Sequence, residues 1–315
     1  MKRCLYCYLP LSPSENDYHA TCSRKIFGQP TPPDLPYSEA DFEPLAVEAV
    51  RRQISVTGAQ PKLSLHIGND VGSISGKRFT IVGLWGGYIL KPPAMQYPEL
   101  PETEDLTMHL ASIAGIRTVP HSLIRLASGN LAYITKRVDR KAKTKLAMED
   151  MCQLTERLTE DKYQGSYEQI AKTIQKYSAA PGLNVATFWE MVLFSFLTGN
   201  ADMHLKNFSL LDQNSLGMQL SPAYDLVNTA LVLPADQEDL ALMLNGRKKN
   251  IRKADFVKAM EGSDLDQIQQ ANIFKGMAKA YPKWMDYIDH SFLSDRSKEK
   301  YKSIIADRMV RLQLQ

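Results

Sequence analysis

Three side chains in the second half of the chain carry groups that phosphoryl transfer requires. Asp202 and Asn207 lie in and beside a polar loop, residues 199–206, and Asp225 follows further along the chain. Phosphoryl transfer needs a carboxylate that orients the attacking hydroxyl and oxygen ligands for a metal ion on the phosphates. Asp and Asn oxygens suit Mg²⁺. We therefore expect Asp202 to orient the hydroxyl, and Asn207 and Asp225 to bind Mg²⁺.

A second group upstream could hold the nucleotide. Lys91 ends an apolar strand, residues 88–91, and Glu104 lies in the helix expected next. Residues 54–63 join two expected strands, and the small Gly58 within this loop lets the backbone approach phosphates. Singly, each signal has an ordinary explanation, because loop Asp–Asn pairs are commonly capped turns. Together, the order loop, Lys, Glu, Asp–Asn and Asp follows that of protein kinases. Residues 72–78 lack the Walker A spacing, which disfavours a P-loop NTPase.

The elements that must position these residues change character along the chain. Alternating apolar residues predict strands at 54–56, 63–67, 79–82, 87–91, 122–126 and 131–138, a turn at 68–70, and helices at 38–50 and 102–114. The second half predicts helices at 167–177 and 185–197, a hairpin of 207–211 with 218–220, and helices over 250–315. We therefore expect an α+β, protein-kinase-like bilobed fold: an N-terminal segment at 1–30, an N-lobe at 31–145 and a helical C-lobe at 146–315.

Composition restricts the class of protein. The 315 residues include 38 Lys and Arg and 35 Asp and Glu, a net charge of +3, which is too low for a general nucleic-acid binder. No apolar run is long enough to cross a bilayer, and the first residues lack a signal-peptide core. Four cysteines in a chain of this length do not form a disulfide scaffold. We expect a cytoplasmic protein with no membrane partner and no direct DNA binding.

The N-terminal segment carries a set of metal-ligand side chains. Two residues separate Cys4 from Cys7, and two residues separate His19 from Cys22 after an intervening loop. Paired short spacings of this kind suit tetrahedral Zn²⁺, and a short segment has little core without a metal. The alternative is that these are reduced cysteines on a packed strand and helix. Any zinc here would be structural, and Cys152 is expected to be a buried thiol.

Four stretches are informative together: ISVTGAQPKL at 54–63, MEDMCQ at 148–153, GNADMHLKNFS at 199–209 and LSPAYDL at 220–226. In combination they resemble the HipA family of Ser/Thr kinase toxins. The resemblance runs from about residue 50 into the C-terminal helices. It implies a kinase that uses ATP and Mg²⁺, with Asp202 as the catalytic residue and Asn207 and Asp225 as the Mg²⁺ ligands.

The same resemblance implies further site residues. Nucleotide contacts would come from Gly58, Ala59, Gln60, Lys62, Lys91, Glu104, His204 and Lys206, with an adenine hinge from Lys136 to Val138. Ser55 is similar to the autophosphorylation site of the family, and Thr57 shares the loop, so either hydroxyl could be modified. A phosphoryl group there adds nearly two negative charges. Those charges would compete with the ATP phosphates and switch the kinase off.

One departure from the longer HipA proteins concerns partners. The Gly-rich loop begins near residue 54, whereas longer members carry a further N-terminal subdomain before it. The chain is similar in this respect to HipT, the short kinase of HipBST toxin–antitoxin systems, which implies a HipS-like small antitoxin and a HipB-like DNA-binding antitoxin. The implied substrate is a Ser of an aminoacyl-tRNA synthetase, of the tryptophanyl type for HipT, with translation inhibited as a result.

Alternatives remain at the level of sequence. Basic clusters at 136–145 and 247–253 are commonly solvated faces, or they could dock a tRNA-bound synthetase. The chain could instead phosphorylate a small molecule or lipid. It could also be an inactive kinase-like module that binds a partner through its cysteine segment, although the complete set of Lys91, Asp202, Asn207 and Asp225 argues against that.

Overall fold

The computed structural model describes residues 2–42, 62–70, 72, 75–82, 86–141, 144–213, 216–233, 235 and 237–315. The chain divides into two compact units. Unit 1 comprises Met1–Asp105, Val119–Arg137 and His290–Phe292, and unit 2 comprises Leu106–Thr118, Val138–Asp289 and Leu293–Gln315. The strand predicted at 54–56 lies outside the described residues, as do Ser55, Thr57, Gly58, Ala59 and Gln60.

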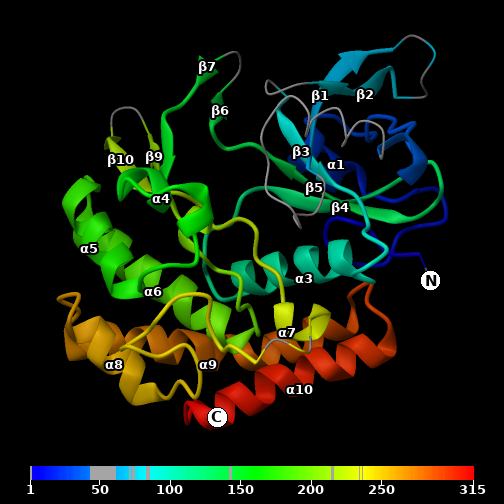
Figure 1. Cartoon of the computed structure of the whole chain (residues 1–315). Coiled ribbons are helices and arrows are strands. Elements are labelled where there is room, and N and C mark those ends of the chain that lie inside the picture. Colours follow the sequence, from blue (N-terminus) through cyan, green and yellow to red (C-terminus); the bar gives the residue numbers. More distant parts are fainter. Residues whose placement is uncertain are drawn as a thin grey trace. The chain divides into compact units, whose positions relative to one another are not determined.

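Unit 1 contains a five-stranded antiparallel sheet in the order β2-β1-β3-β5-β4 (Figure 1). Its strands are β1 (Leu63–Asn69), β2 (Lys77–Val82), β3 (Tyr88–Lys91), β4 (His121–Arg125) and β5 (Leu131–Lys136). The turn predicted at 68–70 is displaced, because Gly68 and Asn69 still pair with Arg78 and Lys77 of β2. Buried residues of the sheet include Leu65, Leu90 and Ile134, so an apolar core holds β3, which ends at Lys91.

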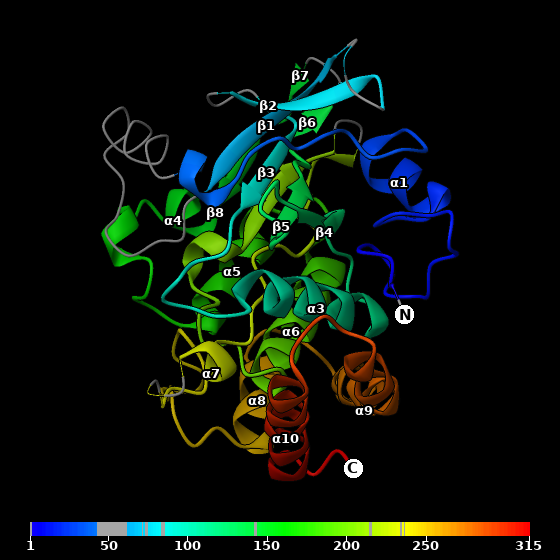
Figure 2. The ribbon, with the colours of Figure 1, turned by 90° about the vertical axis from the view of Figure 1, so that its right-hand side faces the viewer.

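The N-terminal segment packs on this sheet within unit 1. Helix α1 (Ala20–Phe27) places the Phe27 ring against Phe79 and Tyr88, and the Tyr88 hydroxyl donates to the Ile26 carbonyl at 2.9 Å. Leu123 of β4 donates its backbone N–H to the Leu5 carbonyl, so the segment lies along β4 (Figure 2). Residues 39–42 are helical, and both the backbone and the hydroxyl of Ser38 donate to the Asp41 carboxylate, as at a helix cap. The remainder of the helix predicted at 38–50 lies outside the described residues.

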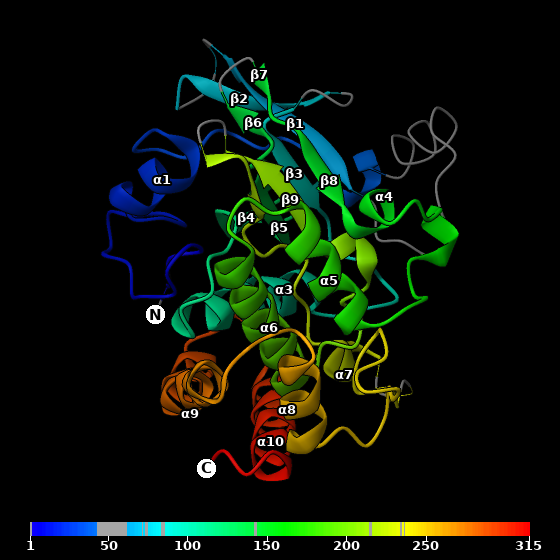
Figure 3. The same ribbon diagram turned by 90° about the vertical axis from the view of Figure 1, so that its left-hand side faces the viewer.

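Helix α3 (Leu100–Ile113) begins in unit 1 and ends in unit 2, followed by Gly115 with φ +90°. Unit 2 is largely helical. Helices α5 (Tyr167–Tyr177) and α6 (Pro181–Leu197) lie side by side (Figure 3). The core helix α6 begins four residues before the predicted start, because Pro181 occupies the first turn. The remaining helices are α4 (Met151–Leu154), α7 (Thr229–Val232), α8 (Lys253–Glu261), α9 (Gln267–Asp289) and α10 (Asp295–Arg311).

A small antiparallel sheet of unit 2 has the order β10-β9-β8. Strands β9 (Ser209–Asp212) and β10 (Met218–Leu220) form the predicted hairpin, and β8 (Met148–Asp150) adds an unpredicted third strand. A second pair consists of β6 (Arg140–Lys141) and β7 (Thr144–Lys145), and short 3₁₀ turns occur at η1 (Thr159–Asp161) and η2 (Leu205–Asn207). The described part of the chain has no helix that is both long and apolar enough to span a bilayer.

The C-terminal end of α6 is fixed by contacts that only particular residues can make. Gly199 has φ +76°, and a Cβ there would lie 2.7 Å from Asn228 Oδ1 and 3.0 Å from Ile304 Cγ2. A side chain at this position would therefore meet both steric and backbone strain. The buried Arg308 of α10 donates from its guanidinium to the Phe196 carbonyl. These contacts set the point from which the polar loop at 199–206 leaves the core.

Candidate active site

The loop after α6 is held by its own hydrogen bonds. The Asp202 N–H donates to Asn200 Oδ1 at 3.0 Å, and the Asn207 amide donates from Nδ2 to the Asp202 carbonyl at 2.9 Å. The Thr229 hydroxyl accepts from the Ala201 N–H at 2.8 Å and donates to the Gly199 carbonyl at 3.1 Å. Asn207 is 4% exposed. Because its Nδ2 is used within the loop, Oδ1 is the atom that Asn207 can offer to a cation.

Asp225 is placed beside this loop by its neighbour in the chain. The Tyr224 hydroxyl donates to the Lys206 carbonyl at 2.9 Å and bonds the Ser209 hydroxyl at 2.5 Å. Burial raises the pKa of the Tyr224 phenol, so it stays a neutral donor. The half-buried Asp225 has φ +59°, a left-handed conformation that non-glycine residues adopt mainly where the surroundings impose it. Such strain is concentrated at functional sites.

The charges of Asp202 and Asp225 both act on the buried imidazole of His204. Its imidazole is 6% exposed, and burial lowers its pKa, while the negative charges of Asp202 and Asp225 both oppose that shift. One imidazole therefore lies within the fields of both carboxylates. Its Nδ1 is buried without a hydrogen-bond partner among the described residues. Hydrogen bonds thus link the segments of Asp202, Asn207 and Asp225 in unit 2, and the buried His204 lies on the same loop as Asp202.

Lys206 is paired rather than isolated. Its Nζ lies 2.6 Å from Asp150 Oδ2, and its side chain is 34% exposed. Asp150 also caps α4 by accepting from the Gln153 N–H at 3.0 Å. Sequence reasoning identified the MEDMCQ stretch at 148–153 but did not assign Asp150 a role. A phosphate that approached Lys206 would therefore meet a cation already shared with a carboxylate.

Tyr163 is a further residue that sequence reasoning missed. Its hydroxyl donates to Asp202 Oδ1 at 2.6 Å, and its ring packs edge-on against His204 with centroids 5.0 Å apart. The backbone is also joined here, because the Leu205 N–H donates to the Lys162 carbonyl at 3.1 Å. A Tyr in a polar loop gives no periodic signal, so only the structure reveals that it reaches Asp202.

Unit 1 places Lys91 and Glu104 together. Lys91 Nζ lies 2.5 Å from Glu104 Oε1, and the two residues are 4% and 3% exposed. The Tyr133 ring centroid lies 5.4 Å from the same ammonium. Among the other predicted contacts, Lys62 and Lys136 are exposed, Val138 is half-buried, and the loop residues Gly58, Ala59 and Gln60 fall outside the described residues.

The cysteine and histidine side chains of the N-terminal segment form a cluster. The ligand atoms of Cys4, Cys7, His19 and Cys22 all lie within 4.8 Å of one another. A hydrogen bond from the Cys7 thiol lowers the pKa of Cys4 to about 5, and burial raises the pKa of Cys22. Cys152, outside the cluster, is buried as predicted.

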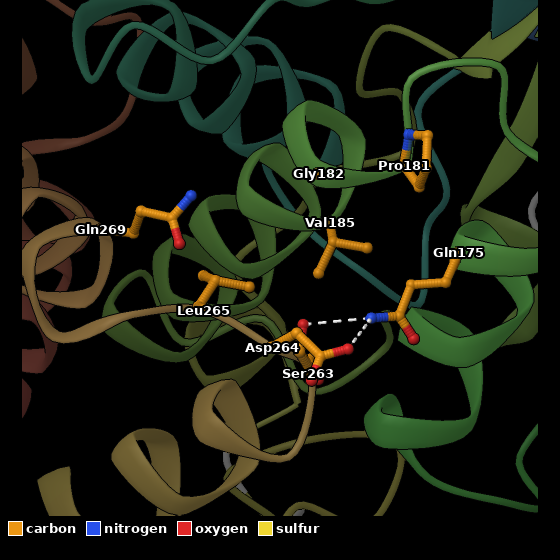
Figure 4. Close-up of a pocket in the computed structure, with 8 residues that line it drawn as sticks. All are labelled: Gln175, Pro181, Gly182, Val185, Ser263, Asp264, Leu265 and Gln269. Atoms are coloured by element: carbon orange, nitrogen blue, oxygen red, sulfur yellow. Dashed lines mark hydrogen bonds between the residues drawn. The ribbon is translucent and has the colours of Figure 1, made fainter.

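A surface pocket of unit 2 lies away from these residues. It is lined by Gln175, Pro181, Gly182, Val185, Ser263, Asp264, Leu265 and Gln269 (Figure 4). Gln175 Nε2 donates to the Ser263 carbonyl at 3.1 Å and to Asp264 Oδ2 at 3.2 Å. None of the predicted site residues lines this pocket, and two of its polar side chains bond each other.

Comparison with known proteins assigns the chain to a family. The model of the HipA-like C-terminal domain matches residues 54–285, more than half of the chain. This chain belongs to that family. The match includes the positions of Lys91, Glu104, Asp202, Asn207 and Asp225, whereas the cysteine and histidine cluster precedes it.

Two relatives illustrate the similarity. A protein of Haemophilus influenzae that is named as a kinase is 30% identical over 212 residues, 63% of this chain and 59% of that protein. The serine/threonine-protein kinase toxin HipA of Shewanella oneidensis is 28% identical over 217 residues, 62% of this chain and 48% of that protein. The chain therefore spans about half the length of the relatives it matches.

Solved structures establish the fold. HipA of Shewanella oneidensis, determined with HipB and operator DNA, matches with a TM-score of 0.68 at 22% identity, covering 82% of this chain and 65% of that one. The proinflammatory kinase CtkA of Helicobacter pylori matches with a TM-score of 0.52 at 17% identity, covering 71% and 87%. The predicted α+β, kinase-like fold of the HipA type is confirmed.

The buried Lys91–Glu104 pair predicts an asymmetric response to mutation. Lys91→Met leaves a buried carboxylate without its cation, which should lower the free energy of unfolding by about 3–5 kcal/mol. Lys302 and Asp289 form a matched control, also 2.5 Å apart but more exposed, so Lys302→Met should cost at most about 1 kcal/mol. Urea unfolding measures both. Equal costs for the two variants would contradict a buried pair.

Proposed function

We propose that the protein is an ATP-dependent serine/threonine protein kinase that acts as the toxin of a toxin–antitoxin system. The observation that carries this proposal is that hydrogen bonds in unit 2 join the segments of Asp202, Asn207 and Asp225: Asn207 Nδ2 donates to the Asp202 carbonyl, and the Tyr224 hydroxyl, beside Asp225, donates to the Lys206 carbonyl. These residues lie in the stretch matched by the HipA-like family, and the relatives over that stretch are named as kinases.

The donor set fits magnesium. A carboxylate and an amide oxygen are hard ligands of the kind that Mg²⁺ takes in nucleotide sites. When bound, Mg²⁺ would supply positive charge that offsets the charge of the phosphates. Asn207 Oδ1 and Asp225 would hold it, since the Asn207 Nδ2 is used by the loop and Tyr224 fixes the start of the Asp225 segment.

Each remaining residue has a defined task in this proposal. Asp202 accepts the hydrogen bond of the attacking hydroxyl and orients it toward the γ-phosphate. Lys91, held by Glu104, pairs with the α- and β-phosphates. Lys206 and His204 lie beside the phosphates, with Asp150 limiting the net charge of Lys206. The loop with Gly58, Ala59, Gln60 and Lys62 covers the phosphates, and Lys136 to Val138 contact adenine.

Regulation, substrate and partners follow from the family. Phosphorylation of Ser55 or Thr57 would repel the ATP phosphates and stop turnover. The proposed substrate is a Ser of an aminoacyl-tRNA synthetase, of the tryptophanyl type, in the cytoplasm. The solved structure of Shewanella HipA is a complex with HipB and operator DNA, which supports a HipB-like antitoxin as a partner here. A HipS-like small antitoxin is proposed from the resemblance to HipT alone.

Replacement of Asp202 tests the proposal. Asp202→Asn keeps the shape of the side chain but removes the carboxylate, and phosphoryl transfer should fall by about 10²–10⁴-fold with folding unchanged. Asp307→Asn, an exposed position on α10, is the matched control. Phosphoproteomics after pulsed expression of each form measures the transfer. If expression of Asp202→Asn gave the same protein phosphorylation as expression of the wild type, the assignment would be refuted. If the wild type phosphorylated metabolites and not proteins, a small-molecule substrate would be favoured.

A further inference from the structure

We propose that Cys4, Cys7, His19 and Cys22 bind one structural Zn²⁺ that anchors the N-terminal segment to the sheet of unit 1. The proposal concerns residues outside the stretch matched by the HipA-like family, and it stands whether or not the protein is a kinase. Zinc binding would release the remaining thiol protons to solvent and leave three thiolates and a neutral imidazole around the metal.

The spacing of the ligand atoms is that of a tetrahedral site. Ligand atoms about 2.0–2.3 Å from a common zinc lie roughly 3.5–3.8 Å from one another. His19 Nδ1 lies 3.4 Å from Cys7 Sγ and 3.7 Å from Cys22 Sγ, and all four ligand atoms lie within 4.8 Å. Little movement would bring the four atoms to bonding distance of one ion.

The imidazole is presented in the tautomer that a metal needs. His19 Nε2 lies 3.0 Å from the Pro10 carbonyl, so Nε2 carries the proton and Nδ1 keeps its lone pair toward the sulfurs. His19 also occupies the N-cap of α1 without capping it through its side chain. Ser, Thr, Asp or Asn would serve as a cap. A histidine at this position is explained by the cluster and not by the helix.

The turn that carries Cys4 and Cys7 is strained in a way that a metal would stabilise. Tyr8, directly after Cys7, has φ +63°, and its N–H donates to the Cys4 carbonyl at 2.9 Å. Bulky residues adopt this conformation only when their surroundings hold them there. Bonds from Cys4 and Cys7 to one ion would fix the backbone of residues 4–7, which directly precede Tyr8.

Both ligand pairs adjoin tyrosines that reach the body of unit 1. The Tyr8 ring is 1% exposed, and its hydroxyl donates to Asp105 Oδ2 at 2.7 Å. Tyr18, directly before His19, donates to the Leu123 carbonyl of β4. Asp105 is adjacent in the chain to Glu104, the partner of Lys91. The metal would therefore brace the same unit that holds the Lys91–Glu104 pair.

Metal content tests this proposal directly. Protein purified under reducing conditions should contain one zinc per chain when measured by inductively coupled plasma mass spectrometry. The Cys7→Ser and Cys22→Ser variants should lose most of this zinc. Cys152→Ser, at a buried thiol outside the cluster, should keep it. Exchange with Co²⁺ should give the thiolate charge-transfer and visible bands of a tetrahedral site, and chelation should lower the Tm by roughly 5–10 °C.

The opposite results are equally defined. A wild-type protein without stoichiometric zinc that also gives no tetrahedral cobalt spectrum would overturn the site. If Cys152→Ser lost as much zinc as Cys7→Ser and Cys22→Ser, the loss would be due to unfolding, and the ligand assignment would be overturned. Because the chelation and cobalt experiments use the wild-type chain, they decide the question even if the cysteine variants do not fold.

A separate observation supports a second proposal, which rests on the proposed function: we infer that Tyr163 is a gate on Asp202. Its hydroxyl donates to Asp202 Oδ1 at 2.6 Å, the type of contact that an attacking hydroxyl must make. Tyr163 is 43% exposed, so its side chain has room to rotate away from Asp202. The hydrogen bond from the Leu205 N–H to the Lys162 carbonyl keeps the backbone beside Tyr163 close to the loop. An incoming hydroxyl would have to displace the phenol.

Basal ATP hydrolysis measures this gate without a known protein substrate. Water attacks the γ-phosphorus, the bond to the ADP oxygen breaks, and the water proton passes to the Asp202 carboxylate. Tyr163→Phe should raise kcat about tenfold, because the hydrogen bond to the charged carboxylate no longer has to be broken, and leave the KM for ATP unchanged. Tyr177→Phe, at a similarly exposed tyrosine of α5, should change neither.

The outcomes separate the proposed gate from the proposed kinase function. An active wild type with unchanged or lower kcat in Tyr163→Phe would overturn the gate and leave the kinase proposal intact. A wild type that neither hydrolyses ATP nor transfers phosphate would overturn both.

Discussion

The hydroxyl of Tyr224 joins the two segments that carry the candidate magnesium ligands. It bonds the Lys206 carbonyl, one residue before Asn207, and the Ser209 hydroxyl, two residues after Asn207. Tyr224 itself is followed directly by Asp225. Buried polar groups must be paired, and the Tyr224 hydroxyl pairs with both the Lys206 carbonyl and the Ser209 hydroxyl. Because the phenol is neutral, it joins the two segments without adding charge.

The rest of unit 2 supports this junction. The β8–β9–β10 sheet sets Asp150 beside Ser209, and the Ser221 N–H donates to the Ser209 carbonyl at 2.9 Å. Arg308 holds the last turn of α6 through the Phe196 carbonyl, and Gly199 lets the chain turn there without a side chain. The loop is thus anchored at both ends, which is the pre-organisation that phosphoryl transfer demands from a protein.

Much of this arrangement could be predicted from the sequence because it is local. The bounds of α5 follow from its capping Ser166 and Gln169 and its apolar face, and the Asp202–Asn207 spacing fits one loop. Contacts between distant segments could not be predicted in the same way. The Tyr163 and Asp150 side chains reach the site across loops, and the three-residue strand β8 is too short to give a periodic pattern. Family membership and a kinase-like fold were predicted from motifs and confirmed by comparison.

Anomalous scattering from crystals grown with Mn²⁺ and a non-hydrolysable ATP analogue is the most direct test of the account. We expect a manganese peak within bonding distance of Asn207 Oδ1 and an Asp225 oxygen, with the γ-phosphate facing Asp202. A nucleotide bound elsewhere, or a metal that contacts neither Asn207 nor Asp225, would contradict the assignment of this site.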